Sequence, residues 1–297
     1  MEANFAKNLT GSLERDFDPS YLARCAQLAM VLEVSASPKP GNVDRDHDYP
    51  DTTFEHFLTS AIGTYPILEE AARSHSGVGA LIHASARESL RWQRGGNTHF
   101  GAFVLLIPLL MAAGSSRPVS EIVEETTAED AAEFYRAFSV ADVYVDAVPD
   151  IDLRDAESID KILKEDIRLF DLMKLSVDHD LIADEWVNGF TRTFRCADLI
   201  MEKAEKMSIN DAIVCTFLQM LAETPDTFIQ TKFGRRKSIE VSNHTSRIIA
   251  GNRDLNPIKP RVHEFDRELI REKVNPGSTA DIIIGGLFVA LVLGLRV

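Results

Sequence analysis

Residues 282–295 are the most apolar part of the chain, and they restrict the folds that the chain can adopt. The segment has no charged side chain, and it contains Gly285, Gly286 and Gly294. A run of about 14 residues is too short for a membrane-spanning helix, which needs roughly 20. The segment therefore predicts a helix in the core of the protein, apolar on every side.

Most of the remaining chain carries signals for helices. Asp18-Pro19 places an N-cap residue before a proline in the first helical position, and apolar residues follow at helical spacing from Tyr21 to Val34. Thr127-Ala-Glu-Asp130 is close to a capping box. We expect further helices over residues 53–72, 81–92, 98–113, 158–173, 183–207, 208–223, 262–273 and 279–295, with additional starts near 117 and 127. Only Val143-Tyr-Val145 resembles a strand, so the predicted fold is all-α.

The helices are predicted to form one domain. An aspartate-rich connection over residues 148–156 would suit a boundary between two halves, but segments typical of binding loops lie on both sides of it. We therefore expect an N-terminal extension over residues 1–17 and a single multi-helix globular domain over residues 18–297. Its central cleft would be lined by loops at helix N-termini.

Composition limits the classes of binding partner and the cellular compartment that we expect for this protein. Of the 297 residues 45% are hydrophobic and 26% charged, and the net charge is -14. Such an acidic chain is a poor non-specific ligand for nucleic acid or an anionic membrane. Cys25, Cys196 and Cys215 form no disulfide pattern, which indicates buried thiols in a reducing compartment. Without a signal-peptide pattern, we expect a cytoplasmic protein that acts on small molecules; whether it forms a homo-oligomer stays open.

The segment from Ser35 to Asp48 has the character of a binding loop. It follows an expected helix directly and combines two prolines, a glycine and charges of both signs. Asp44, Asp46 and Asp48 alternate, and their oxygens would suit Mg²⁺ if phosphate oxygens completed the coordination. The alternative is a solvated acidic loop that caps the next helix.

Lys39 lies between Pro38 and Pro40 in this loop. The two prolines restrict the backbone, so the ammonium group would be presented to a phosphate or carboxylate with little freedom. Gly41 would let the backbone approach a ligand closely.

The segment Gly95-Gly-Asn-Thr-His-Phe-Gly101 precedes an apolar helix. N–H groups at such a helix start favour an anion. His99 would be a general acid or base, or a simple hydrogen-bond donor. Asn97 and Thr98 suit a capping role at least as well as a ligand contact.

Two segments near the C-terminal end complete the set. Asn275-Pro-Gly-Ser-Thr-Ala-Asp281 opens the apolar core helix, and Asp281 would either face a ligand or compensate the helix dipole. The stretch from Asp226 to Lys237 ends with four basic residues within six positions. That stretch is the strongest local positive field of the chain, and a solvated basic turn is an equally good interpretation.

Four segments follow one another over residues 20 to 295: Glu33-Val-Ser-Ala-Ser-Pro-Lys-Pro-Gly-Asn-Val-Asp-Arg45, Gly96-Asn-Thr-His-Phe-Gly101, Asp226-Thr with Lys232 and Gly234, and Asn275-Pro-Gly-Ser-Thr-Ala-Asp281. In order and spacing they resemble the triphosphoribosyl-dephospho-CoA synthase family, and more closely a divergent branch found in archaea and methylotrophs. The resemblance implies an all-helical fold and a transfer reaction between ATP and 3′-dephospho-CoA. Adenine is released, and the triphosphorylated ribose becomes linked to the 2′-hydroxyl of the dephospho-CoA ribose.

The resemblance also implies roles for the motif residues. A triphosphate with Mg²⁺ needs carboxylates for the metal and cations for the oxygens. Asp44, Asp46 and Asp281 are the candidates for the metal, and His99, Asp44 and Asp281 are those for catalysis. Substrate and phosphate binding would fall to the other motif residues, namely Lys39, Gly41, Arg45, Asn97, Thr98, Lys232 and Asn275.

Two features depart from the family pattern, Phe100 and the run Arg87-Glu-Ser-Leu-Arg-Trp92 that precedes the second motif. Bacterial members usually have a lysine where this chain has Phe100. Three hypotheses follow: triphosphoribosyl transfer to dephospho-CoA, a related Mg²⁺-dependent ribosyl or nucleotide transfer to another cofactor precursor such as a pterin, and a non-catalytic helical protein that binds a nucleotide.

Overall fold

The computed structural model describes residues 17–141, 156–252 and 254–297. Within these ranges the chain forms helices and no β-strand, apart from an isolated bridge between Asp44 and His47. The all-α prediction is therefore confirmed. In chain order the helices are α2 (Pro19–Ser35), α3 (Phe54–Gly63), α4 (Tyr65–Arg73), α5 (Val78–Trp92), α6 (Phe100–Ser115), α7 (Val119–Glu124), α8 (Ala128–Ala141), α9 (Ala156–Lys164), α10 (Leu169–Ser176), α11 (Leu181–Val187), α12 (Thr191–Ala204), α13 (Ile209–Glu223), α14 (Thr227–Phe233), α15 (Arg235–Ile249), α16 (Lys259–Glu272) and α17 (Gly277–Val292).

Some expectations fall on other residues. The strand candidate Val143-Tyr-Val145, nearly all of the connection over 148–156, and residues 1–16 of the expected N-terminal extension lie outside the described ranges. These expectations stay predictions.

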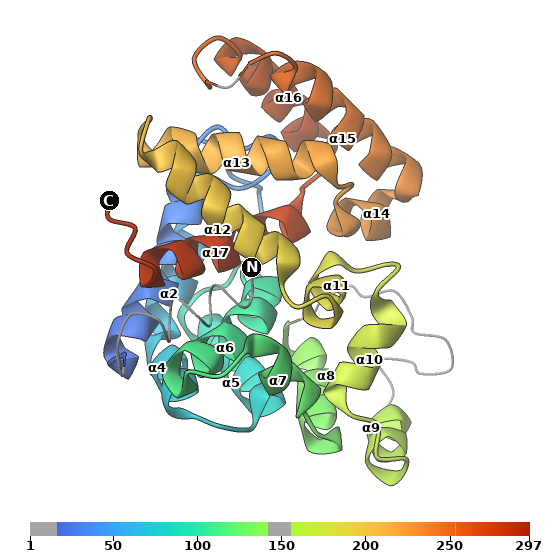
Figure 1. Cartoon of the computed structure of the whole chain (residues 1–297). Helices are drawn as coiled ribbons and strands as arrows, with labels where there is room; N and C mark the ends of the chain where they lie inside the picture. The colour runs from blue at the N-terminus through green and yellow to red at the C-terminus, as the bar shows by residue number, and fades with distance from the viewer. Residues whose placement is uncertain (1–16, 142–155, 253) are drawn as a thin grey trace.

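Helix α17 lies at the centre of the molecule (Figure 1). Helices α2, α6, α12 and α13 pack around it, and its side chains are buried from Ile282 to Val292. Gly286 allows α12 to come close, because a Cβ atom at this position would lie 2.5 Å from the sulfur of Cys196. The predicted core helix is confirmed, and the other helices are arranged around it.

Side-chain caps define the helix starts that the sequence predicts. At α2, the Asp18 carboxylate accepts a hydrogen bond from the Ser20 backbone N–H at 3.1 Å. At α8, the backbone N–H of Thr127 donates to the Asp130 carboxylate at 2.9 Å, and that of Asp130 donates to the Thr127 hydroxyl at 3.2 Å. Each cap satisfies N–H groups that have no partner within the helix.

Three predicted helices are interrupted in the structure. The one over residues 53–72 is divided at Thr64 into α3 and α4, since Pro66 at the start of α4 has no N–H with which to continue α3. The other two are divided where the backbone turns left-handed. Asp166, with a φ of 53°, lies between α9 and α10, and Gly189, with a φ of 65°, lies between α11 and α12. The prediction of continuous helices was wrong at these three places.

The basic stretch that ends at Lys237 is exposed from Lys232 to Arg236 and includes the junction of two helices, which agrees with the alternative of a solvated basic turn. Helices α14 and α15 meet at Gly234, whose φ of 83° suits glycine. On α15, Arg236 pairs with Glu240 at 2.9 Å and Lys237 pairs with Glu272 of α16 at 2.6 Å. These two basic side chains thus form surface ion pairs.

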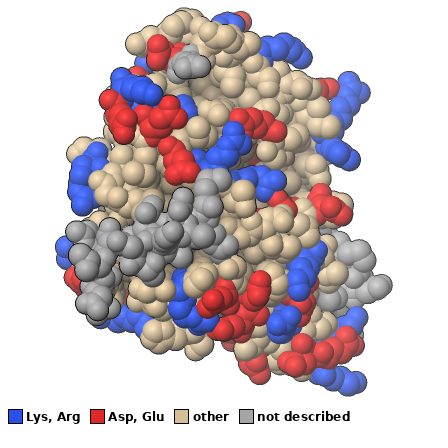
Figure 2. Space-filling model, viewed as in Figure 1, with Lys and Arg blue, Asp and Glu red and all other residues tan. Residues whose placement is uncertain are grey.

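The remaining features agree with the composition. All three cysteines are buried and unpaired, as predicted. Acidic and basic side chains are intermixed over the face drawn in Figure 2. None of the helices within the described ranges has the length and apolar character that crossing a bilayer requires.

Candidate active site

A cavity of about 350 Å³ lies where several helices begin. Its walls include the starts of α6, α11, α14 and α17, together with Glu33 near the end of α2. Part of the wall is aromatic: Phe138 lies 5.0 Å from Phe100 and 4.8 Å from Phe134 between ring centroids. The cavity therefore combines N–H-rich helix ends with carboxylates and apolar rings, which is typical of a small-molecule site.

Glu33 is the most deeply buried carboxylate of this wall. It takes a position on the apolar face of α2 and forms an ion pair with Lys39, whose Nζ lies 2.6 Å from Oε1. The same ammonium group donates to Asn42 Oδ1 at 2.8 Å and to the Val43 carbonyl at 3.3 Å. Burial raises the pKa of Glu33, and the Lys39 charge opposes that rise. Lys39 is fully buried and is not presented to a ligand; it holds Glu33 and Asn42 at the cavity.

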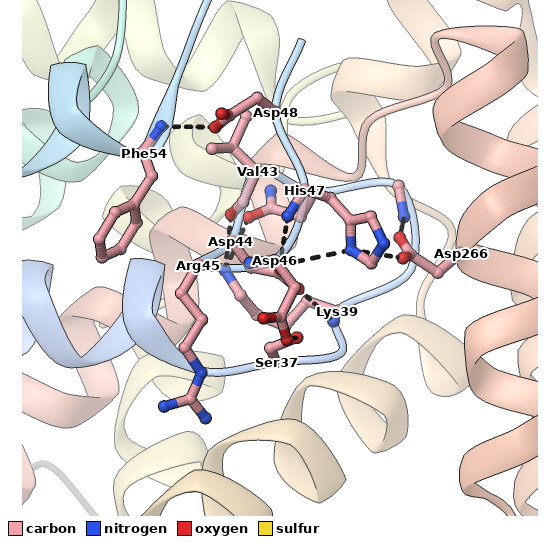
Figure 3. A network of polar contacts seen from close by, with 12 residues as sticks. Ser37, Lys39, Val43, Asp44, Arg45, Asp46, His47, Asp48, Phe54 and Asp266 are labelled. Atoms are coloured by element: carbon pink, nitrogen blue, oxygen red, sulfur yellow. Dashed lines mark hydrogen bonds and ion pairs between the residues drawn. The ribbon is translucent and has the colours of Figure 1, made fainter.

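The aspartate loop is organised by its own carboxylates (Figure 3). Asp44 is fully buried and accepts hydrogen bonds from the backbone N–H groups of Lys39, Asp46 and His47 at 2.9 to 3.1 Å. Asp46 accepts from the Ser37 hydroxyl at 2.7 Å. Neither side chain lines the cavity.

Asp48 supports the alternative interpretation of this loop. Its carboxylate accepts from the Phe54 N–H at 2.7 Å, and so it caps α3 (Figure 3). Among the described residues no group of three or more His, Cys, Asp and Glu side chains is arranged to bind a metal. The loop's aspartates therefore build the loop and the next helix start.

Helix α16 fastens the loop from the other side. Asp266 is fully buried, accepts from the Gly41 N–H at 2.9 Å, and lies 2.9 Å from His47 Nδ1 (Figure 3). Burial raises the pKa of Asp266 to about 6. Gly41 has a φ of 75°, and a Cβ atom on it would lie 2.2 Å from the Val274 carbonyl oxygen. Gly41 therefore allows close packing against Val274 and is not needed for the approach of a ligand. No pattern in the sequence indicated the contact with Asp266.

Asp281 faces the start of α6 from the first turns of α17. The Ala102 backbone N–H lies close enough to its carboxylate to lower the pKa, so this acid occupies the position that favours an anion at the start of α6. Burial, followed by the nearby carboxylates of Glu33, Asp226 and Asp180, raises the pKa of Asp281 well above its ordinary value. Carboxylates at this density favour a proton or a cation between them.

Gly101 leaves the space that Asp281 needs. A Cβ atom on Gly101 would lie 2.1 Å from Oδ2 of Asp281. We expect Gly101→Ala to displace this carboxylate. The kcat/KM of the reaction that takes place in this cavity should then fall by about 10²-fold, as a misplacement of roughly 1 Å can cause. The circular dichroism spectrum of Gly101→Ala should match that of the wild type. Gly96→Ala is unsuitable as a control, because Gly96 has a φ of 69°, which alanine adopts only with strain. Gly79→Ala, whose Cβ would meet the Asp130 backbone 2.0 Å away, controls for general crowding because neither residue lines the cavity. Equal activity losses in both variants would contradict this role.

The segment 97–101 places three predicted residues at the cavity. Asn97 Oδ1 accepts from the Phe100 N–H at 3.0 Å, which is a capping contact. Thr98 Oγ1 lies 3.4 Å from the Ser89 hydroxyl. The imidazole of His99 is buried, its Nδ1 lies 2.9 Å from the Ser60 hydroxyl, and burial lowers its pKa to about 3.

Asp226 joins the starts of two helices. Its Oδ1 accepts from the Ile229 N–H of α14 at 3.0 Å, while its Oδ2 accepts from the N–H and hydroxyl of Thr279 in α17 at 2.7 and 2.8 Å. Burial raises the pKa of Asp226 to about 6. One carboxylate therefore sets the relative position of Lys232 on α14 and Asp281 on α17.

Cations lie at the exposed part of the cavity wall. Lys232 and Lys273 are both exposed and both line the cavity, and Lys232 Nζ lies 4.1 Å from the centre of the Phe228 ring. Asn275 also lines the cavity and accepts from Asn42 Nδ2 at 3.0 Å. Arg45, by contrast, points to Asn210 and takes no part in the wall.

Comparison with known proteins agrees with this geometry. A sequence model of the ATP:dephospho-CoA triphosphoribosyl transferase family matches residues 19–296. The chain belongs to this family. It is 25% identical over 273 residues to 2-(5″-triphosphoribosyl)-3′-dephosphocoenzyme-A synthase from Pectobacterium atrosepticum, a match that covers 86% of this chain and 83% of the relative. It is also similar to a crystal structure from Archaeoglobus fulgidus described as a triphosphoribosyl-dephospho-CoA synthase, with a TM-score of 0.67 and 26% identity over 82% of this chain and 100% of that one.

The structure of this triphosphoribosyl transferase family member sorts the predicted site residues into two groups. Those at the cavity are Asn97, Thr98, His99, Lys232, Asn275 and Asp281. Those that lie behind it and hold the loop are Lys39, Gly41, Asp44, Arg45 and Asp46. Glu33 and Asp180 were not among the site residues predicted from the sequence. An acidic residue at a position on the apolar face of α2 could have indicated Glu33.

Proposed function

We propose that this protein transfers the triphosphoribosyl group of ATP to the 2′-hydroxyl of 3′-dephospho-CoA and releases adenine. The observation that carries the proposal, beside family membership, is the half-buried acid Asp281, whose pKa is raised, at a cavity that also holds Glu33 and two lysines. Since ATP is a cytoplasmic nucleotide, we expect the reaction to take place in the cytoplasm.

The reaction breaks the bond between C1′ of the ATP ribose and N9 of adenine. A bond forms between C1′ and the 2′-oxygen of dephospho-CoA, and the hydroxyl proton is balanced by the proton that adenine gains. Positive charge develops on the ribose during this step, and a nearby carboxylate stabilises it. Asp281 and Glu33 are the residues for this role, and the raised pKa of Asp281 also suits it to accept the hydroxyl proton.

The phosphates would lie at the cationic part of the wall. Lys232 and Lys273 supply positive charge there, and Gly277 and Ser278 at the start of α17 line the same cavity. A helix start and lysines together favour phosphate oxygens. Asn97, Thr98 and Asn275 would orient the ribose.

Mg²⁺ would accompany the triphosphate. In nucleotide sites it takes one or two protein carboxylates and completes its coordination with phosphate oxygens and water. Asp281 and Glu33 fit this pattern, since each lines the cavity and they repel each other electrostatically. The carboxylates of Asp44 and Asp46 instead accept hydrogen bonds within the loop. The metal would supply charge neutralisation to the triphosphate.

Incubation of the purified protein with Mg²⁺, ATP and 3′-dephospho-CoA tests the proposal. We expect free adenine by chromatography and a CoA product whose mass has increased by the triphosphoribosyl group. Omitting dephospho-CoA should abolish the adduct. A folded protein that binds Mg²⁺ATP, as seen by thermal stabilisation, but yields neither product would overturn the proposal and leave a nucleotide-binding role or a different acceptor.

A further inference from the structure

The Nε2 atom of His99 is a polar atom without a partner inside the protein. The imidazole is only 1% exposed, and among the described residues no group hydrogen-bonds this nitrogen. The ring lies between Phe57, at 5.0 Å in an edge-on arrangement, and Phe103, at 6.1 Å. His99 and Phe57 both line the cavity. A buried unpartnered nitrogen in the wall of a cavity indicates a contact that a bound ligand completes.

The other ring nitrogen ends a chain of buried hydroxyl groups. The Ser89 hydroxyl donates to the Ser60 hydroxyl at 2.7 Å, and the Ser60 oxygen lies 2.9 Å from His99 Nδ1. Ser60 is fully buried, Ser89 is 4% exposed, and Thr98 Oγ1 lies 3.4 Å from Ser89. The Ser60 oxygen accepts from Ser89, and among the described residues its own proton has no hydrogen-bond acceptor other than Nδ1 of His99. Because a fully buried hydroxyl proton without an acceptor is costly, we assign this proton to the contact with Nδ1.

We propose that Ser60 and Ser89 are positioning residues that hold His99 as a neutral imidazole with its proton on Nε2, so that His99 donates one hydrogen bond to an acceptor atom of the bound nucleotide. An imidazole that accepts at Nδ1 must carry its single proton on Nε2. The hydroxyl chain therefore selects the tautomer, and the two phenylalanine rings keep the imidazole in place.

The surroundings of His99 keep this imidazole neutral. Burial, with a smaller contribution from the charge of Lys39, lowers the pKa of His99 to about 3. At neutral pH the ring cannot supply a proton as an imidazolium ion would. The inference thus deepens the proposed function: it rests on that function for the identity of the nucleotide, and it replaces proton transfer by His99 with hydrogen-bond donation.

Nitrogen-15 NMR of the full-length protein tests the tautomer without any activity. His99 signals are assigned by their loss in His99→Gln. We expect the Nε2–H tautomer at pH 7, unchanged between pH 5 and 8, and a shift toward a mixture of tautomers in Ser60→Ala. Ser85→Ala is the matched control, because Ser85 of α5 is fully buried, as Ser60 is, and its hydroxyl has no partner among the described residues. An Nδ1–H tautomer, a titration of His99 between pH 5 and 8, or equal shifts in Ser60→Ala and Ser85→Ala would overturn the inference.

Kinetics supply a second measurement. We expect Ser60→Ala to raise the KM for ATP about tenfold, as the loss of one hydrogen bond of ordinary strength does, with the shape of the pH profile of kcat preserved. Ser60→Thr, which keeps the hydroxyl, should restore KM. A Ser60→Ala variant that changes the pH profile of kcat would indicate proton transfer by His99 and contradict the inference. If the wild-type protein released no adenine, the proposed function would fail, whereas the NMR result on the tautomer would stand by itself.

Discussion

Asp281→Asn is expected to lower turnover by about 10²- to 10³-fold, the loss typical of removing one electrostatic contact to a transition state, while it raises thermal stability at neutral and alkaline pH. The carboxylate of Asp281 lies among those of Glu33, Asp226 and Asp180, and burial with this repulsion raises its pKa. A carboxyl group whose pKa is raised by folding stabilises the protein at low pH, and that stability is lost as the pH rises through the folded-state value. Because the asparagine side chain does not ionise, the variant does not show this loss of stability as the pH rises.

Adenine release and melting temperature, each recorded from pH 5 to pH 9, check this expectation. The stability gain of Asp281→Asn should grow with pH, since only the wild-type protein loses stability as Asp281 ionises. Asp198→Asn is the control, because Asp198 is an exposed acid on the neighbouring helix α12 and does not line the cavity. An Asp281→Asn variant with wild-type turnover would exclude Asp281 from the chemistry.

Lys39→Met is expected to reduce the free energy of unfolding by about 3–5 kcal/mol, the cost of breaking a buried ion pair by removing one partner. The substitution keeps a similar apolar stem but leaves the Glu33 carboxylate buried without its cation, and it deprives Asn42 of a hydrogen bond. Glu33 and Asn42 both line the cavity, so adenine release should fall as well.

Urea denaturation with a matched surface variant measures this effect. Lys206→Met removes an exposed lysine that pairs with Glu202 at 3.1 Å, and such pairs contribute at most about 1 kcal/mol. The double variant Glu33→Gln/Lys39→Met removes the unpaired charge and should recover part of the lost stability. A Lys39→Met variant as stable as Lys206→Met would contradict the structural role assigned to this lysine.

The sequence was sufficient for the all-α fold, and two of its motifs lie at one cavity, the candidate site. Patterns that depend on neighbours in the chain were read correctly: the cap at Asp18, the capping box of Thr127 and Asp130, and the apolar helix that became α17. The motifs around His99 and Asp281 meet at one cavity because both open long apolar helices whose starts lie together.

The direction of a side chain could not be predicted in the same way. Two prolines do restrict the backbone at Lys39, yet whether its ammonium group points to solvent or to Glu33 depends on how the loop folds back onto α2. The same holds for Asp44. Its carboxylate could bind a metal, but in the structure it accepts hydrogen bonds from backbone N–H groups of its own loop. Asp266 lies 218 or more residues further along the chain from the loop that it fastens, and no local pattern connects the two.

The central position of α17 has a consequence for biosynthesis. Its neighbours α2, α6, α12 and α13 all precede it in the chain (Figure 1). While the ribosome is still translating the codons before residue 277, these helices have no central partner, and their apolar faces are open to other nascent chains and to chaperones. The cavity also lacks Asp281 at that stage, so core and active site are completed in the same late step of translation.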